Sequence, residues 1–457
     1  MRNSTSPIRR CCLALLLAAP LMGKAQTDTL KNELTIGLNV MSHGESCNGG
    51  LGSYEVAPGE KWDEEAAEEY LSTHDKSHFL MNRTRLTVDF KRPGLEARLV
   101  GQNLAVWGAK GNTAFTVYEA WAKLSTPKGL FMQVGRQQLA YDDERILGPN
   151  DWAMTALSHD VLRMGYEGHG HKAHAILGYN QNSDNVYSGS TYYKDGAQPY
   201  KTMQTVWYHY DVPKIPLGAS ILFMNIGMQA GKEDDKSNPA HIEWQQLLGS
   251  YVKYSPKHWS IEGSYYHQMG HNEGGIPIDA WMASGKVTLS PTDYYGFQAG
   301  YDYLSGDENF PVPGKHQIGT ILHRKVEGFT LLYGSHHKFY GAMDFFYVTT
   351  YVNGFSPGLQ IAYLEAHGKP LKGLEVSAKY NYLAMATQHE DWSKHLGYEL
   401  DLEVTYKISP DVKVKAGYSH MKGTETMKKL KRSDNKGLLN WGWISLTVSP
   451  NLFTTKW

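Results

Sequence analysis

The sequence predicts an all-β fold: a single 18-stranded antiparallel transmembrane β-barrel with short periplasmic turns and long extracellular loops. Three observations lead to this prediction. Segments of about ten residues alternate apolar and polar side chains along almost the whole chain. The connections between these segments are alternately short and long, and a secretory signal precedes them.

The alternation is clearest at residues 396–407, where large apolar side chains from Leu396 to Tyr406 take turns with small, polar or charged ones. A period of two places successive side chains on opposite faces of a strand. A soluble sandwich would bury its apolar face against a second sheet. A membrane barrel instead turns that face to lipid and its polar face to an aqueous lumen.

Taken in order, each alternating run predicts one strand, and the even total is typical of single-chain bacterial barrels. The 18 runs lie at residues 32–41, 80–91, 95–106, 114–124, 130–140, 159–167, 172–181, 202–211, 218–229, 245–254, 259–268, 279–289, 294–304, 357–367, 374–385, 396–407, 411–421 and 440–449.

The connections agree with one barrel whose turns and loops lie at opposite ends. Every second connection is tight and rich in Pro or Gly, residues that form turns for defined backbone reasons. These turns lie at residues 92–94, 126–129, 213–216, 255–257, 291–293, 368–370 and 409–411. The longest of the other connections lie at about residues 42–79, 182–200, 305–356 and 422–438.

The N-terminus predicts export. Arg9 and Arg10 precede the apolar run 11–22, and small residues follow at the position a signal peptidase reads. We therefore expect a signal peptide at residues 1–25 and a barrel at residues 26–457, with one cysteine, Cys47, and no internal disulfide.

Composition supports a barrel in the outer membrane of a Gram-negative bacterium. The chain holds 30 Tyr, 12 Trp and 46 Gly among 457 residues, and aromatic side chains mark both membrane interfaces of such barrels. Lys and Arg number 45 against 46 acidic residues, so nothing indicates a nucleic-acid partner. The expected partners are outer-membrane lipid, the machinery that inserts barrels, and polar solutes.

Residues 134–152 read VGRQQLAYDDERILGPNDW. This stretch resembles the signature of the alginate export family of outer-membrane porins, in which a strand with Gly-Arg-Gln runs into an Asp-Asp-x-Arg loop. Residues 118–122, 300–306 and 337–347 resemble the branch of that family found in Bacteroidetes-type sequences. The resemblance implies an 18-stranded barrel that passes an anionic polysaccharide through a lumen lined with arginines.

Alternation places several arginines in the lumen, where they could contact the permeating solute. Guanidinium groups suit such a role because they pair bidentately with carboxylates and stay charged. They could equally brace the wall by pairing with Asp89, Glu96 and Glu119. The expected lumen residues are Arg83, Arg85, Arg98, Arg136 and Arg163, of which Arg136 needs a bulge or a strand end to face inward.

The inward faces also carry acids and lysines, so we expect a mixed lumen, which makes alginate itself uncertain as the solute. The acids are Glu262, Asp302, Glu375, Glu399, Asp401 and Glu403, and the lysines are Lys253, Lys286, Lys379, Lys413 and Lys415.

The family motif supplies a second set of candidates in the loop after the strand at 130–140. Its acids and arginine could pin the loop to the barrel or bind a solute, and we expect pinning to dominate. The set comprises Asp142, Asp143, Arg145, Asp151 and Trp152.

No pattern predicts an enzyme, a cofactor or a metal site. His169, His171 and His174 have metal-like spacing but sit at a predicted turn without a fourth ligand. The acidic run 233–235 could hold calcium, although a solvated charge run is commoner.

The predicted function is that of a porin for passive diffusion of polar, anionic solutes such as acidic oligosaccharides or polysaccharides. The alternative is a surface binding or adhesion barrel with a closed lumen. The segment 305–356 is long and rich in aromatic residues. Loops of this length are usually functional or disordered, and the aromatic density argues for order. We therefore expect the segment to fold into or over the lumen and narrow it.

Overall fold

The structure is a computed structural model. It describes residues 31–48, 76–110, 113–194, 196–308, 325–346, 356–388, 392–431 and 438–457. The expected signal peptide at residues 1–25 lies outside the described residues, as do parts of the segments 42–79, 305–356 and 422–438.

The described chain is almost entirely β-strand. Its strands are β1 (Glu33–Asn48), β2 (Lys76–Arg92), β3 (Leu95–Val106), β4 (Thr113–Ser125), β5 (Leu130–Gln137), β6 (His159–Gly168), β7 (His171–Tyr179), β8 (Thr202–Asp211), β9 (Leu217–Ala230), β10 (His241–Tyr254), β11 (Trp259–His271), β12 (Pro277–Leu289), β13 (Tyr295–Leu304), β14 (Leu359–Leu371), β15 (Leu374–Ala384), β16 (His395–Lys407), β17 (Val412–Gly423), β18 (Leu438–Val448) and β19 (Asn451–Lys456).

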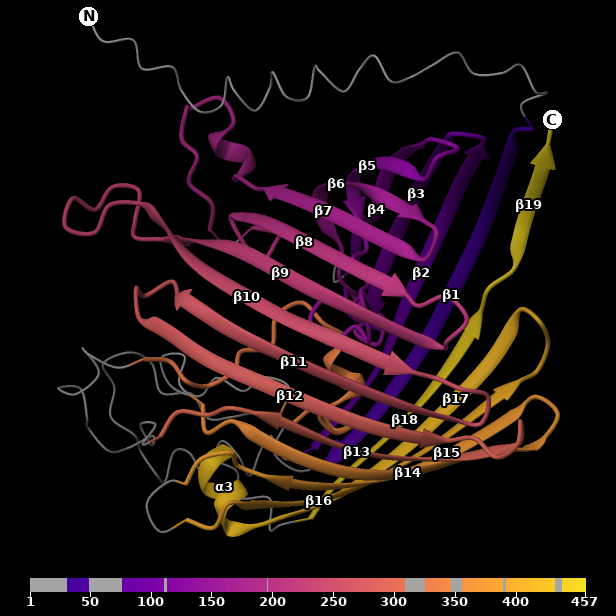
Figure 1. Cartoon of the computed structure of the whole chain (residues 1–457). Helices are drawn as coiled ribbons and strands as arrows, with labels where there is room; N and C mark the ends of the chain where they lie inside the picture. Colours follow the sequence, from indigo (N-terminus) through magenta and orange to yellow (C-terminus); the bar gives the residue numbers. More distant parts are fainter. Residues whose placement is uncertain are drawn as a thin grey trace, which may run out of the picture.

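The strands form one closed antiparallel barrel. Each strand from β1 to β17 pairs with the next along the chain, and β1 closes the sheet by pairing with β2 on one side and with both β18 and β19 on the other. Because β18 and β19 continue one another across Pro450, the barrel has 18 strands, as predicted. Figure 1 shows β1 and the final strands side by side, with tight turns gathered at one end of the barrel.

Each of the predicted alternating runs coincides with a strand, but several strand ends differ. The tight turn predicted at residues 368–370 is wrong: β14 continues through a bulge to Leu371, and the chain turns at Lys372 and Gly373 instead. Gly373 has a φ of 80°, which a residue without a Cβ adopts at little cost. At the C-terminus β19 extends the pairing almost to Trp457.

Side chains alternate across the wall. On β16 the even-numbered residues from Tyr398 to Tyr406 lie exposed on the outside, whereas Glu399 and Thr405 are buried on the inside. A pleated strand presents its two side-chain sets to opposite faces, and lipid requires the outer set to be apolar.

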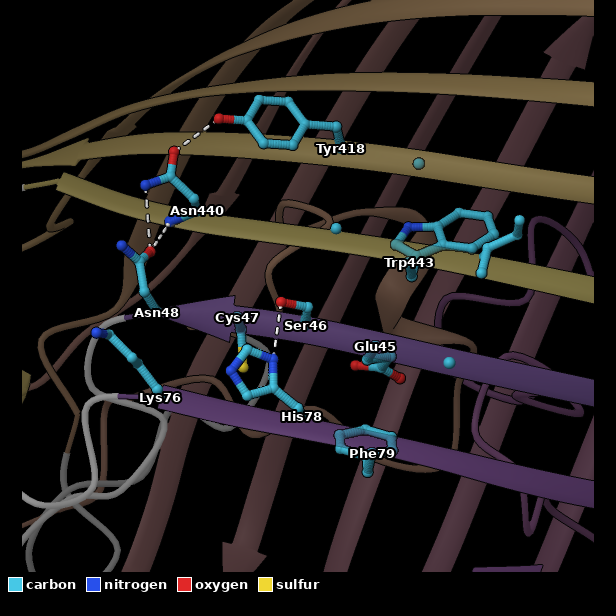
Figure 2. Close-up of a pocket in the computed structure, with 14 residues that line it drawn as sticks. Glu45, Ser46, Cys47, Asn48, Lys76, His78, Phe79, Tyr418, Asn440 and Trp443 are labelled. Atoms are coloured by element: carbon cyan, nitrogen blue, oxygen red, sulfur yellow. Dashed lines mark hydrogen bonds between the residues drawn. The ribbon is translucent and has the colours of Figure 1, made fainter. Parts of the chain in front are cut away.

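The closing seam carries polar contacts near the long-loop end, the end opposite the tight turns. Asn48 of β1 accepts hydrogen bonds from the backbone N–H and the side-chain amide of Asn440 on β18, at 2.6 and 3.2 Å. Tyr418 of β17 donates to Asn440, and His78 of β2 bonds to Ser46. Figure 2 shows these side chains around an open groove at the seam. The bonds tie the first and last strands together.

The barrel interior changes character along its axis. At the long-loop end, inward positions of the wall are apolar and fully buried, and they pack against side chains from two connecting segments. These wall residues include Met203, Met224, Leu247, Met282, Leu304, Ile361, Leu383, Met421 and Leu439.

Helix is scarce in the described residues. The main one, α3 (Glu425–Lys431), lies between β17 and β18, and Figure 1 shows it at the long-loop end. Within the described part of the chain, no helix has the length and apolar character that a membrane crossing would need.

Candidate permeation site in the lumen

Two connecting segments meet inside the long-loop end. We call residues 138–158 the motif loop, and the described residues of the β13–β14 connection (305–308, 325–346 and 356–358) the long loop. Tyr333 forms a parallel β-bridge with Leu147. Its N–H donates to the Ile146 carbonyl at 3.0 Å, and its carbonyl accepts from the Gly148 N–H at 2.9 Å. The two loops therefore form one body.

The long loop is bonded to inward-facing wall residues. The side chain of Gln268 on β11, which is 0% exposed, donates to the Thr330 carbonyl at 2.8 Å and accepts from the Thr330 N–H at 3.0 Å. Val326 forms a β-bridge with Ile278 at the start of β12. These bonds satisfy backbone groups that would otherwise be buried without a partner.

Arg145 links both loops to the wall. Its guanidinium donates to Asp302 on β13 at 2.8 and 3.4 Å, donates to the Tyr340 hydroxyl at 3.2 Å, and lies 4.0 Å from the centre of the Phe339 ring. Burial alone would lower the pKa of Arg145, but the neighbouring Asp302 and Tyr340 reverse this and raise it well above its ordinary value. The arginine stays charged.

The two adjacent acids of the motif have different partners. Asp142 accepts hydrogen bonds from the Trp207 indole at 3.1 Å and from the Ser220 hydroxyl, on β8 and β9. Burial raises the pKa of Asp142, and these two donors act in the opposite direction. Asp143 instead bonds to Arg145 at 3.2 Å. Asp142 therefore attaches the motif loop to the wall, and Asp143 stabilises the loop from within.

Asp151 joins the other end of the motif loop to β2. Its carboxylate accepts from Arg85 at 2.7 Å and from Arg83 at 3.2 Å, and Arg83 also donates to the Asp151 carbonyl. The Arg85 guanidinium lies 3.9 Å from the centre of the Tyr118 ring. Two of the predicted lumen arginines thus contact one loop residue.

Trp152 lies in an aromatic cluster. Its ring stacks on His337 of the long loop, with centroids 4.0 Å apart and planes 1° from parallel. The edges of Trp441 and Trp443 on β18 contact the same ring at 5.7 and 4.8 Å. Such offset and edge contacts add to the energy of burying the rings. Trp152 therefore packs the two loops against the closing seam.

Arg98 and Arg163 face inward but do not share the contact that Arg83 and Arg85 make with Asp151. Arg98 on β3 forms a bidentate pair with Asp89 at 2.7 and 3.0 Å and reaches Glu119 at 3.3 Å. Arg163 on β6 donates to Gln133 at 2.6 Å. The predicted arginines therefore do not form a single group.

Arg136 does not face the lumen, and that prediction is wrong. It lies opposite Ala120 and Asp160 in the sheet, two positions on the outer face. Its guanidinium forms a bidentate pair with Asp160 at 2.8 and 2.6 Å. The neighbouring Gly135, with a φ of 121°, keeps its place in both strand pairings, so no bulge reverses the alternation.

Below the two loops lies a cavity of about 350 Å³ with charges of both signs. Lys253 and Lys286 each lie 3.2 Å from Glu262, and the Lys379 ammonium lies 4.6 Å from the centre of the Tyr363 ring. The other charged lining residues are Asp142, Asp143, Arg145, Lys338 and Glu365.

A larger cavity of about 640 Å³ continues from it toward the tight turns. The two share Asp142, Tyr251 and Lys253, and the larger one reaches the turn residues Pro216 and Ser255. The polar half of the lumen is therefore open from the turn end up to the loops.

The alternation of side chains did not single out the wall residues that hold the loops, notably Gln268 and the two tryptophans Trp441 and Trp443. A signal for them was present. Inward positions near the long-loop end, such as Met421 and Leu439, are apolar, so the strands are apolar on both faces there. Such a run indicates burial on both sides.

The histidines and acids considered as metal ligands do not come together at one site in the described structure. His171 contacts Tyr208 and Tyr210 on the outer face, whereas His174 bonds inward to Tyr141 and Glu167. Asp235 of the acidic run accepts hydrogen bonds from the Ser237 N–H and hydroxyl in an exposed loop. Among the described residues, no three His, Cys, Asp or Glu side chains are placed to share a metal ion.

Comparison with known proteins identifies one family. The model of the alginate export family matches residues 112–437. No curated protein matches the sequence.

Solved structures with the same fold include outer-membrane proteins of Pseudomonas aeruginosa. OccK11 (OpdR) is 12% identical, with a TM-score of 0.56 over 92% of this chain and 96% of that one. OpdL is 12% identical, with a TM-score of 0.57 over 92% and 99%. OpdK, solved with vanillate, is 10% identical, with a TM-score of 0.54 over 92% and 99%.

Proposed function

Because this chain belongs to the alginate export family and forms a β-barrel of the Gram-negative outer membrane, we propose that it passes anionic solutes by diffusion. The class of solute is acidic oligosaccharides or polysaccharides. The family membership and the fold support an outer-membrane channel and favour transport over catalysis. Charged side chains around a lumen set the preference of a pore for one sign of ion.

The observation that carries the proposal is the cavity below the loops. Its lining holds five cationic side chains, from Arg145 and four lysines, against four acids. Glu262 forms salt bridges with two of the lysines, and Asp143 shares Arg145 with Asp302. The Lys379 ammonium lies over an aromatic ring and makes no salt bridge within the described residues, although Glu365 and Asp401 lie opposite Lys379 on β14 and β16. It is therefore available to a solute carboxylate.

The inward arginines contribute in a different way. Arg83 and Arg85 engage Asp151, and Arg98 engages Asp89 and Glu119. We assign these three to bracing, and Arg163, whose described partner is the neutral Gln133, to contact with the solute. The solute path then runs from Arg163 to the lysines of the cavity.

The long loop and the motif loop together define the narrowest part of the proposed path. Their apolar side chains pack against the wall and leave the polar cavities on the turn side. A solute crossing the barrel must pass between these loops and the wall. The loops therefore control conductance.

The test is the reversal potential of single barrels in lipid bilayers under a KCl gradient. Wild type is expected to prefer anions, and Lys286→Gln with Lys379→Gln is expected to shift the reversal potential toward cation preference. In this double variant Lys253 still neutralises Glu262, and Arg145 still neutralises Asp302. Lys428→Gln on α3, whose partner is the exposed Glu425, is the matched control and should leave the potential unchanged. Acidic oligosaccharides should block the current more than neutral ones of equal length.

A cation-selective wild type, or a double variant identical to wild type, would contradict the anion preference. One observation favours a second function, a surface binding barrel with a closed lumen: the hydrophobic core that the loops form inside the long-loop end. That alternative predicts no conductance from correctly folded barrels, so the same recording separates the two.

A further inference from the structure

Two inward-facing acids on β16 lie against the long loop, and neither forms a salt bridge within the described residues. Glu399 is buried and Asp401 is half-buried. Their hydrogen-bond donors include the Met343 N–H, the Asn381 amide and the Ser419 hydroxyl, all of them neutral. Lys379 lies opposite Asp401 on β15 without a salt bridge to it. A buried carboxylate on the same face as a second one needs a positive charge or a proton nearby.

The neighbouring strands add further oxygens at the same level. Asn381 lies directly opposite Glu399 on β15, and Ser419 lies opposite Asp401 on β17. The Asn381 amide nitrogen donates to Asp401 at 2.8 Å, and the Ser419 hydroxyl donates to it at 2.7 Å. Register therefore brings two carboxylates, an amide and a hydroxyl together.

Two acceptor atoms in this group have no donor. Glu399 is 1% exposed and Asn381 is 0% exposed, yet neither Glu399 Oε2 nor Asn381 Oδ1 accepts a hydrogen bond of normal geometry in the described structure. Buried acceptors of this kind are normally satisfied. The Asn381 oxygen can only accept, and the Glu399 oxygen can accept or carry a proton, so the missing partner is a donor, a cation or a proton that the two acids share.

The long loop covers this group. Met343 N–H donates to Glu399 Oε1 at 3.1 Å, and a Cβ on Gly341 would come within 2.8 Å of Glu399 Oε2. Gly341 also has a φ of 94°, so the backbone there requires glycine. The close approach leaves the carboxylate between the wall and the loop.

We propose that Glu399, Asp401 and Asn381 bind a hard divalent cation, Ca²⁺ or Mg²⁺, which fastens the long loop to β16. Carboxylate and amide oxygens are the ligands these ions prefer, and water from the lumen completes the coordination. The ion neutralises both carboxylates and satisfies both orphan oxygens. The site controls the position of the loop and does not depend on which solute the channel passes.

The test is calorimetric titration of CaCl₂, and separately MgCl₂, into the purified barrel after removal of metal with EDTA at pH 8. Thermal unfolding is recorded with and without the ion. Wild type is expected to bind and to unfold at a higher temperature with the ion. Glu399→Gln and Asp401→Asn keep the side-chain shapes and should weaken binding about 10- to 100-fold. Glu403→Gln is the matched control, because Glu403 faces inward next to the site but pairs with Lys415 at 2.7 Å.

Absence of binding and of thermal stabilisation in wild type with both ions would overturn the proposal, as would equal loss in Glu403→Gln. If lowering the pH alone stabilises wild type and Glu399→Gln removes that effect, a shared proton takes the place of the cation. Binding is measured without any current, so a failure of the channel proposal would leave this result intact.

Discussion

At the scale of single residues, the charged side chains inside this barrel mostly hold its loops. Arg145 illustrates the principle, because it lies between Asp302 of the wall and Tyr340 of the long loop and is only 3% exposed. Removing one partner of such a pair leaves the other charge buried and uncompensated. Replacing both partners with apolar groups often leaves the stability of the protein unchanged.

This principle gives a prediction for the pair. Arg145→Met should lower the free energy of unfolding by about 3 kcal/mol or more, because Asp302 is 1% exposed and would lose its counter-charge. The double variant Arg145→Met with Asp302→Leu should recover most of the loss. Denaturant unfolding of barrels refolded into lipid vesicles measures both. If the double variant loses as much free energy of unfolding as Arg145→Met and Asp302→Leu lose together, the two residues are not coupled.

At the scale of elements, strands and loops differed in how far the sequence determined them. Strand positions followed from alternation because lipid outside and water inside impose it on every strand, as on β16. The inward pairing of Arg145 with Asp302 joins positions far apart in the chain, and no local pattern encodes it. Arg136 shows the converse: alternation alone indicated the outer face, where Arg136 lies, and the bulge that a lumen position required is absent.

The motif loop and the long loop are also the elements most open to a direct test. The Asp307 N–H donates to the Ser356 carbonyl at 2.6 Å, so the two ends of the β13–β14 connection already touch. Replacing residues 309–354 with a short Gly-Ser linker should therefore leave the wall closed. Single-channel conductance should rise about twofold or more, because a barrel of this size encloses an aqueous channel unless something fills it.

The control for this excision is an equally short linker in place of residues 184–190 of the β7–β8 connection, an exposed stretch that includes Tyr187. It should leave conductance unchanged. Heat-dependent gel migration reports whether both variants still form barrels. Unchanged conductance in a folded excision variant would place the long loop outside the solute path.

At the scale of the whole molecule, the barrel places its two kinds of connection on opposite sides of the membrane. Both ends of the described chain meet at the turn end, where Asn32 and Trp457 exchange backbone hydrogen bonds of 2.8 and 3.1 Å. Figure 1 shows the C-terminus at the end opposite α3. In bacterial barrels the short turns are periplasmic and the long loops extracellular. The loops, the proposed cation site and the narrowest part of the path then belong to the outer side.

This orientation predicts which residues react with a thiol reagent that cannot cross membranes. The native Cys47 is only 5% exposed, and Cys47→Ser removes any labelling of this residue. In the Cys47→Ser variant, Tyr187→Cys, at a position 99% exposed on a long loop, should be labelled in intact cells. Lys257→Cys, in the exposed β10–β11 turn, should be labelled only after the outer membrane is permeabilised. The reverse pattern would mean that the turns face outward, and the loop constriction would then lie on the periplasmic side of the channel.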